Sequence, residues 1–346
     1  MATTVVNMIP IALSGESNQD SEPMIAVNLE NPLQIAGSAF TPDPANGPNA
    51  PIYVSTDGGN TWVLNTIVPS NPATGDICMR FGTQGGRLYI GILQQPFGLR
   101  LNILRTTNFT AATPATLLVD RGPSPNVDQP FVQAATLLGG GPVGIDRVYV
   151  GNNDFAGAPN TATVDVSLDG AAATPPPPAN FNARRLDTRA STTGQDSPQI
   201  RPAVHLDGTV YAIYAARTAV SSGIRTCNIV VVRDDNWAAG GTQFNDLIDS
   251  GDSQRGQIIV SGVNVVWNTG TGLGQERLGG NVAIAVDPRD STNVYAAWAD
   301  NAGSLSTLHV RRSQTSGQTW SGDLRVITNA INPALAINSR GRVCLR

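Results

Sequence analysis

Charge is scarce in this chain, and lysine is absent from it. Charged residues make up 14% of the 346 residues, and all 22 basic residues are arginines. An ordinary soluble domain has about a quarter of its residues charged. The formal net charge is −4 and the arginines form no cluster, so we expect no nucleic-acid partner.

Cysteine and long apolar runs are scarce as well. Cys78, Cys227 and Cys344 lie far apart and form no C-x-x-C pair, which argues against a metal–thiolate site. We expect three buried thiols, with one disulfide and a leftover thiol as the alternative. No apolar run has the length of a membrane-spanning helix, so no membrane span is expected. The first residues lack the basic and apolar regions of a signal peptide.

Glycine and proline are abundant, with 36 and 24 residues, which favours many short strands joined by turns. The stretch Ser55-Thr56-Asp57-Gly58-Gly59-Asn60-Thr61-Trp62 stands between two β-type runs. Its spacing, S-x-D-x-G-x-T-W, predicts a tight antiparallel hairpin. Ser and Asp can accept turn amides, the glycines allow positive φ, and Trp covers an apolar face.

A pattern of up to four strands recurs along the chain. The predicted units cover residues 20–70, 76–121, 128–189, 196–250 and 280–328, and a last unit combines 332–346 with 5–13. Repeats of this period with four strands each are typical of a β-propeller. We therefore predict one propeller domain over residues 1–346. The glycine-rich segment 238–280 interrupts the period and is predicted to be a binding loop.

A second copy of the turn supports the repeat. Residues 313–320 match the first turn, with Thr315 in place of Asp, and weaker copies follow Thr106 and Ser167. The pattern resembles the Asp-box, or BNR repeat, of sialidase-like β-propellers. That resemblance implies an all-β propeller of four-stranded antiparallel blades, six in number, with an incomplete or terminus-closed last blade. The turn residues are then structural: Ser55, Asp57, Gly59, Thr61, Trp62, Ser313, Gly317, Thr319 and Trp320.

An aspartate stands ahead of four predicted innermost strands: Asp20, Asp76, Asp128 and Asp196. If these carboxylates converge at the mouth of the channel, they need a compensating cation or hydrogen-bond donors. The sequence therefore predicts a ligand site there, with Ca²⁺ as a candidate ion. In the alternative, each Asp caps its own turn.

The sialidase resemblance also implies a catalytic set: three arginines for a carboxylate, a tyrosine paired with a glutamate, and an aspartate acid. The candidates in this chain are Arg80, Arg201, Arg277, Glu276 and Asp128. The family's Arg-Ile-Pro motif is not matched, and no Tyr follows Tyr295. The resemblance therefore supports the propeller fold more strongly than it supports sialidase activity.

Our first functional hypothesis is a non-catalytic module that binds a glycan or a protein partner at the propeller face. A glycoside hydrolase of exo-sialidase type and a structural component of a larger assembly are the alternatives. Composition and the resemblance favour an extracellular location.

Overall fold

The computed structural model describes residues 5–9, 21–40, 52–65, 74–94, 100–111, 115–121, 127–137, 145–170, 181–189, 199–222, 224–266, 282–301 and 306–345. The regular structure of these residues is all β, apart from one 3-10 turn, η2 (Phe155–Gly157). They contain no helix that is long and apolar enough to cross a membrane.

Within the described residues, five sheets have four strands each, and in all five the sheet order follows the chain, so each strand pairs with the next. The first sheet contains β1 (Ser21–Val27), β2 (Ile35–Phe40), β3 (Ile52–Ser55) and β4 (Val63–Asn65). The second contains β5 (Thr74–Phe81), β6 (Leu88–Gln94), β7 (Arg100–Thr106) and β8 (Thr116–Arg121). The third contains β9 (Val127–Thr136), β10 (Asp146–Asp154), β11 (Ala162–Ser167) and β12 (Phe181–Arg185).

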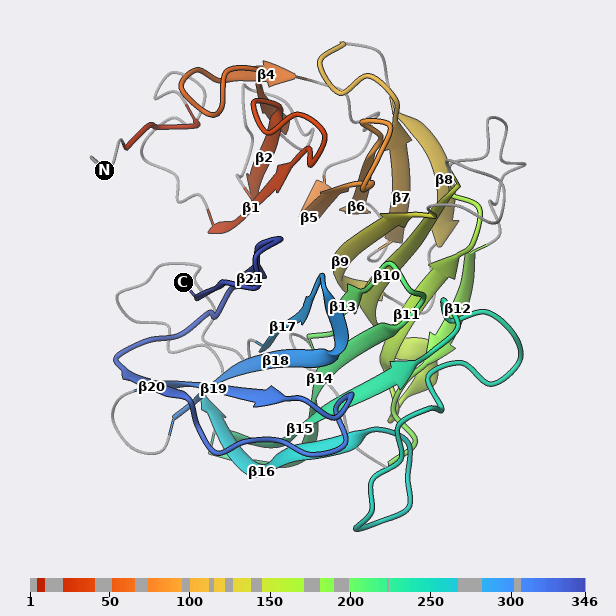
Figure 1. Cartoon of the computed structure of the whole chain (residues 1–346), viewed down its shortest axis with the longest axis vertical. Helices are drawn as coiled ribbons and strands as arrows, with labels where there is room; N and C mark the ends of the chain where they lie inside the picture. The colour runs from red at the N-terminus through yellow and green to blue at the C-terminus, as the bar shows by residue number, and fades with distance from the viewer. Residues whose placement is uncertain are drawn as a thin grey trace. The chain divides into compact units, whose positions relative to one another are not determined.

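The fourth sheet contains β13 (Arg201–Val204), β14 (Val210–Ser221), β15 (Ile224–Asp234) and β16 (Gln257–Val266). The fifth contains β17 (Val282–Asp287), β18 (Asp290–Asp300), β19 (Thr307–Ser313) and β20 (Arg325–Thr328). A separate two-stranded sheet pairs β21 (Leu335–Ile337) with β22 (Val343–Leu345). These four-stranded antiparallel sheets are the blades of a β-propeller, as the sequence predicted (Figure 1).

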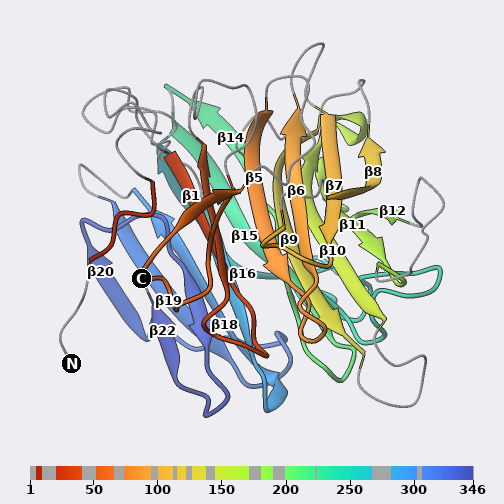
Figure 2. The same ribbon diagram turned by 90° about the horizontal axis from the view of Figure 1, so that it is seen from above.

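The second and third strands of a blade are its most apolar ones. In β6, Leu88, Tyr89, Ile90, Ile92 and Leu93 are all buried, and Figure 2 shows β6 between β5 and β7. A strand covered on both faces loses the apolar–polar alternation of a half-exposed strand. The first strands of neighbouring sheets pack together: β1 on β5, β5 on β9, and β13 on β17. We call them the inner strands.

A tyrosine near the start of the second strand ties neighbouring sheets together. Tyr89 donates to Asp146 Oδ2 (2.6 Å), Tyr149 to the Trp237 carbonyl (3.0 Å) and Tyr211 to the Ser291 carbonyl (2.7 Å). Each ring is buried in its own sheet and each hydroxyl reaches the next one. The repeat therefore includes a hydrogen bond between blades as well as the turn.

The chain divides into two compact units. The first comprises Met1–Val148 and Asp169–Phe181, and the second comprises Tyr149–Leu168 and Asn182–Arg346. The boundary falls inside β10, in the middle of a strand rather than in a linker. The single-domain assignment stays a prediction.

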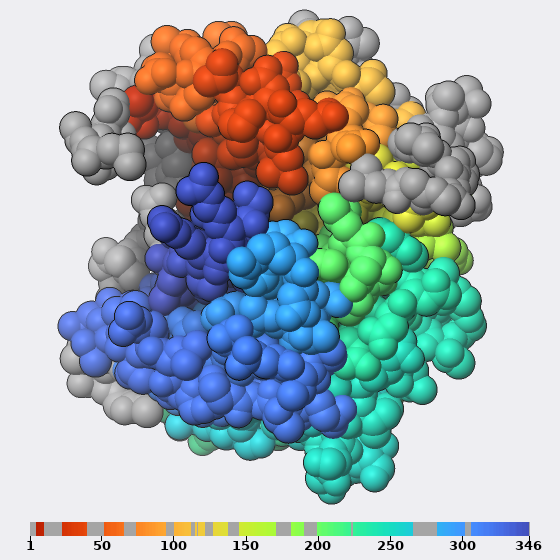
Figure 3. Space-filling view, in the orientation of Figure 1, coloured from red at the N-terminus to blue at the C-terminus, as the bar shows by residue number. Residues whose placement is uncertain are grey.

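The chain ends differ in part from expectation. Met8 and Ile9, predicted in the last blade, pack with Ala39, Tyr53 and Trp62 of the first sheet. At the other end, β21 and β22 are half-buried or exposed, and Figure 3 shows the C-terminal segment at the surface. Cys344 is also exposed, which corrects the expectation of three buried thiols; Cys78 and Cys227 are buried, and none of these three described cysteines forms a disulfide.

The fourth sheet reaches beyond residue 250, where the sequence placed its end. Residues 257–266 form the outer strand β16, which pairs with β15 from Val231↔Gln257 to Ile224↔Val266. The predicted insertion at 238–280 therefore contains a blade strand. The glycines before and inside this strand hid it, because Gly256 and Gly262 take positive φ (79° and 72°) at its start and at a bulge.

Candidate functional site

Two of the four predicted aspartates lie at the beginning of neighbouring inner strands. Asp76 is the third residue of β5 and Asp128 the second of β9. The two strands are in contact, since the Val132 amide donates to Cys78 Sγ (3.2 Å). We call the end of a sheet at which its inner strand begins the strand-start end. Both carboxylates therefore belong to this end of their sheets.

Asp128 and Asp76 differ in their surroundings. Asp128 is buried, and its Oδ1 accepts the amide of Gln129 (3.0 Å), whose φ is 55°. Asp76 is half-buried. A carboxylate at a strand start can hold the local backbone, or it can accept hydrogen bonds from a ligand. The buried Asp128 fits the first role, and the half-buried Asp76 fits the second.

Four predicted site residues lie outside the described part of the chain: Asp20, Asp196, Glu276 and Arg277. Among the described residues, no group of three or more His, Cys, Asp or Glu side chains is placed to hold a metal ion. The four-carboxylate cluster stays a prediction.

The two described arginines of the predicted cluster, Arg80 and Arg201, lie at different positions along the inner strands of their sheets. Arg80 is opposite Tyr89, and Arg201 is opposite Ile213, two residues beyond Tyr211. Because Tyr89 and Tyr211 occupy the same place in their strands, Arg201 corresponds to Cys78 rather than to Arg80. Arg80 also lies four residues past Asp76, roughly 13 Å along β5, away from the strand-start end. A shared three-arginine pocket stays a prediction.

Arg80 is exposed. Arg201 is half-buried and donates to the Ile200 carbonyl (3.3 Å).

The two Trp-containing turns use their side chains locally. In the first turn (residues 55–62), Ser55 Oγ accepts the Gly59 amide (2.9 Å), and Asp57 accepts the amide and hydroxyl of Thr61 (2.9 and 2.7 Å). These bonds lower the pKa of Asp57 to about 2. The indole of Trp62 donates to the Gly59 carbonyl (3.0 Å).

The second turn (residues 313–320) repeats this pattern. Ser313 Oγ accepts the Gly317 amide (2.9 Å), Thr315 Oγ1 accepts the Thr319 amide (2.9 Å), and Trp320 donates to the Gly317 carbonyl (2.8 Å). The Thr315 hydroxyl thus replaces the Asp57 carboxylate without changing the turn.

All five blades end their third strand on a buried oxygen-bearing side chain: Ser55, Thr106, Ser167, Asp234 and Ser313. Sequence reasoning missed Asp234, which lacks the Thr-Trp that follows in a full motif. Its Oδ1 accepts the amides of Asn236 and Ala238 (both 2.8 Å), as Ser55 accepts two and four residues ahead, and its Oδ2 accepts the Phe244 amide (3.0 Å).

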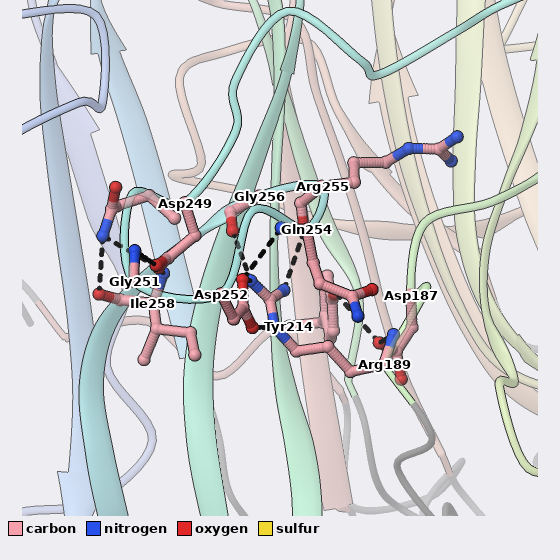
Figure 4. Close-up of polar contacts among 11 residues, drawn as sticks. Asp187, Arg189, Tyr214, Asp249, Gly251, Asp252, Gln254, Arg255, Gly256 and Ile258 are labelled. Atoms are coloured by element: carbon pink, nitrogen blue, oxygen red, sulfur yellow. Dashed lines mark hydrogen bonds and ion pairs between the residues drawn. The ribbon is translucent and has the colours of Figure 1, made fainter.

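A polar network around Arg189 links the end of the third sheet to the fourth sheet (Figure 4). Arg189 donates to Asp252 Oδ2 and Oδ1 (2.6 and 3.0 Å) and to the carbonyls of Arg255 and Gly256 (2.7 and 2.8 Å). The Arg255 guanidinium in turn donates to the Arg185 carbonyl (2.7 Å). The guanidinium of Arg189 therefore holds the 249–256 loop against the segment that follows β12.

Asp187 and Tyr214 form the buried part of this network. The Tyr214 hydroxyl lies 3.5 Å from Asp187 Oδ1, which also accepts the Arg189 amide (2.9 Å). Burial raises the pKa of Asp187 to about 6, and burial also raises the pKa of Tyr214. A carboxyl with such a pKa can exchange a proton near neutrality. Asp187 is only 3% exposed and Tyr214 is fully buried, so a substrate has no access to the pair.

Comparisons with known proteins find the fold but no family. No protein-family model matches the chain, and neither does any curated protein. Among solved structures, the GH93 α-L-arabinofuranosidase of Fusarium graminearum is similar, with a TM-score of 0.56 and 12% identity over 95% of this chain and 87% of that one. The Penicillium chrysogenum α-L-arabinanase has a TM-score of 0.52 and 13% identity over 94% and 92%.

The leech intramolecular trans-sialidase is a third similar structure, with a TM-score of 0.54 and 11% identity over 99% of this chain and 67% of that one. At such identities the similarity concerns the fold. The chain has the sialidase-like propeller fold that its turns suggested.

Proposed function

We propose that this propeller is a non-catalytic module that binds a glycan at the strand-start end of its blades. The observation that carries the proposal is the half-buried carboxylate of Asp76 at the start of the inner strand β5, next to the start of β9, where the buried Asp128 holds its own turn. Carboxylate oxygens are strong acceptors for the hydroxyl groups of a sugar. Glycan recognition is also the property that the similar arabinanase and trans-sialidase structures share by name, although fold alone does not carry function.

Binding without turnover is supported by the tyrosines. No Tyr follows Tyr295 in the sequence. Tyr89 contacts Asp146 and Tyr214 contacts Asp187, but all four side chains are buried. A nucleophile has to reach the sugar carbon, and these groups are covered by their own blades.

A glycan array probed with the labelled protein tests the proposal, followed by titration of the best ligand. We expect Asp76→Asn, which changes a half-buried side chain, to weaken binding at least about tenfold, since charge-assisted hydrogen bonds to the ligand are lost. Asp290→Asn is the matched control, because this exposed residue lies where β17 turns into β18, at the opposite end of its sheet. Equal loss in both variants, or no glycan bound at all, would contradict the proposal.

A turnover assay on aryl sialosides and arabinosides distinguishes the hydrolase alternative from the binding proposal. Turnover that Asp128→Asn abolishes while the fold, checked by circular dichroism, is kept would replace the binding proposal. A soluble partner protein retained with no glycan bound would favour the assembly role.

We further propose Ca²⁺ as the ion to test at these carboxylates, since hard oxygen donors suit it. If Ca²⁺ binds, adding it raises Tm in the parent protein but not in Asp76→Asn. A Tm that Ca²⁺ and a chelator leave unchanged would mean that each Asp caps its own turn.

A further inference from the structure

The last sheet has two strands in the described part of the chain, where the other sheets have four. β21 and β22 pair with each other, and no described residue pairs with the other edge of β22, which we call its outer edge. The Arg342 carbonyl accepts the Asn338 amide (3.1 Å). Because hydrogen-bonded pairs alternate along an antiparallel ladder, the backbone groups of Val343 and Leu345 point to the outer edge.

The last sheet covers only part of the fifth sheet. Leu335 and Leu345 pack with Leu308 and Val310 of β19. Beyond them every residue of β20 is exposed. Ile327 is paired with Leu308, so it lies on the face that the last sheet covers elsewhere, yet it is 41% exposed. Figure 3 shows the C-terminal strands in dark blue at the surface, next to the blue fifth sheet. A strand added at the outer edge of β22 would extend the last sheet toward Ile327.

This surface is basic in a chain of net charge −4. From Leu324 to Arg346 the sequence contains four arginines and no Asp or Glu. Arg325, Arg340 and Arg342 are exposed, and within the described residues their guanidinium groups have no hydrogen bond or ion pair. Unpaired guanidinium groups are strong donors to carboxylates, so the charge of the surface fits an acidic partner.

The two faces of β22 differ in character. Val343 and Leu345 lie on the face toward the fifth sheet, since Leu345 packs there, and Arg342 lies on the opposite face. A strand alongside β22 would place alternate side chains next to Val343 and Ile327 on one face and next to Arg342 on the other. Apolar residues suit the first face and acidic residues the second.

We propose that the outer edge of β22 binds an extended segment of a partner protein in which apolar and acidic residues alternate. The segment adds a third strand to the last sheet, held by main-chain hydrogen bonds to Val343 and Leu345. Its apolar side chains cover Ile327, and its carboxylates pair with Arg342. This docking does not depend on glycan binding.

The test titrates three labelled peptides of equal length against the intact protein by fluorescence anisotropy. One alternates Val and Glu, one alternates Val and Lys, and one is the Val–Glu peptide with N-methylated valines. Directly opposite residues share a face, so the valines oppose Val343 and Leu345, and methylation removes the amides that bond there. We expect the Val–Glu peptide to bind and the other two to bind at least about tenfold more weakly.

Two matched variants locate the contact. Arg342→Gln should weaken binding of the Val–Glu peptide about two- to fivefold. Arg100→Gln, which removes the same charge from β7 of the second sheet, should leave it unchanged. Hydrogen exchange should show that the 335–345 segment gains protection when the Val–Glu peptide binds. Circular dichroism checks the folding of each variant.

Other results would overturn the inference in distinguishable ways. Equal binding of the N-methylated peptide would exclude strand pairing, and equal losses in the two arginine variants would reduce the effect to net charge. Strong protection of the Val343 amide in the free protein would mean that another part of this chain, or a second copy if the protein is dimeric, already pairs with the edge. Absence of binding by the Val–Glu peptide would exclude the proposed partner.

Discussion

At the residue scale, the fold disfavours the charge on Asp187. Its pKa is raised by burial from 3.8 to about 6. A carboxyl whose folded pKa is raised stabilises the fold most when it is protonated, below the unfolded pKa, and this contribution is lost as pH rises through about 6.

We therefore predict that Asp187→Asn raises the free energy of unfolding by about 1–3 kcal/mol at pH 7.5 and changes little at pH 4. The Asn oxygen can still accept the Arg189 amide. Urea denaturation at both pH values measures the difference. The control is Asp252→Asn, whose carboxyl has a pKa lowered mainly by Arg189; at pH 7.5 this exposed change should be neutral or slightly destabilising. A destabilised Asp187→Asn protein at pH 7.5 would contradict the reasoning.

The two Trp-containing turns offer a reciprocal exchange, because Thr315 occupies the place of Asp57. Asp57 has a pKa lowered to about 2 by its bonds to Thr61, so its contribution is present above the usual pKa of 3.8 and is lost as pH falls through 2. We predict that Thr315→Asp raises Tm by about 1–2 °C at pH 7 and that Asp57→Thr lowers it. Thermal melts at pH 7 and pH 2 check this; an equal effect at both pH values would exclude the carboxylate as its cause.

At the element scale, the tyrosine hydrogen bonds between blades should be measurable one at a time. Tyr211→Phe removes the donor to the Ser291 carbonyl, and we expect a loss of about 1 kcal/mol in unfolding free energy. Tyr295 occupies the same strand position, and within the described part of the chain the structure gives its hydroxyl no hydrogen bond; the Arg312 guanidinium lies over its ring. Tyr295→Phe should therefore be nearly neutral. If the two variants lose equal unfolding free energy, the loss does not come from the hydrogen bond of the Tyr211 hydroxyl.

At the scale of the whole molecule, stability should peak between about pH 4 and pH 6. Below this range the protein loses the contribution of carboxylates whose pKa values are lowered by hydrogen bonds or arginines: Asp57, Asp207, Asp252, Asp287 and Asp323. Their stabilisation is present above the usual pKa and is lost as pH falls. Above the range, Asp187 becomes charged in a buried place.

Thermal melts from pH 2 to pH 8 measure this profile, and the peak should broaden toward higher pH in Asp187→Asn. A parent protein whose Tm rises steadily to pH 8 would contradict the prediction, because the cost of the Asp187 charge would then be too small to detect.

Much of the architecture follows from local sequence. Residues 55–62 specify their own turn, since Ser55, Asp57 and Trp62 all bond within it. The predicted first and fifth units, 20–70 and 280–328, contain all the strands of the first and fifth sheets. Such features depend on neighbours only a few residues away, and a repeat multiplies the signal.

Other features needed the tertiary structure. The strand β16 was hidden by glycines at its start and bulge, and only pairing with β15 defines it. Asp234 matches no motif, yet it takes the role of Ser55 because it ends the same strand of its blade. The bonds of Arg189 to Asp252, Arg255 and Gly256 join residues more than 60 positions apart, and no local pattern encodes them.

By itself, then, the sequence determined the repeating turn, the four-strand unit and hence the propeller. The tertiary structure decided that Asp76 and Asp128 lie at strand starts, that Arg80 and Arg201 lie at different positions along their inner strands, and that Asp187 is buried. The physical reason is range: a turn is set by hydrogen bonds within a few residues, whereas the burial and pKa of Asp187 depend on strands that meet only when the blades pack.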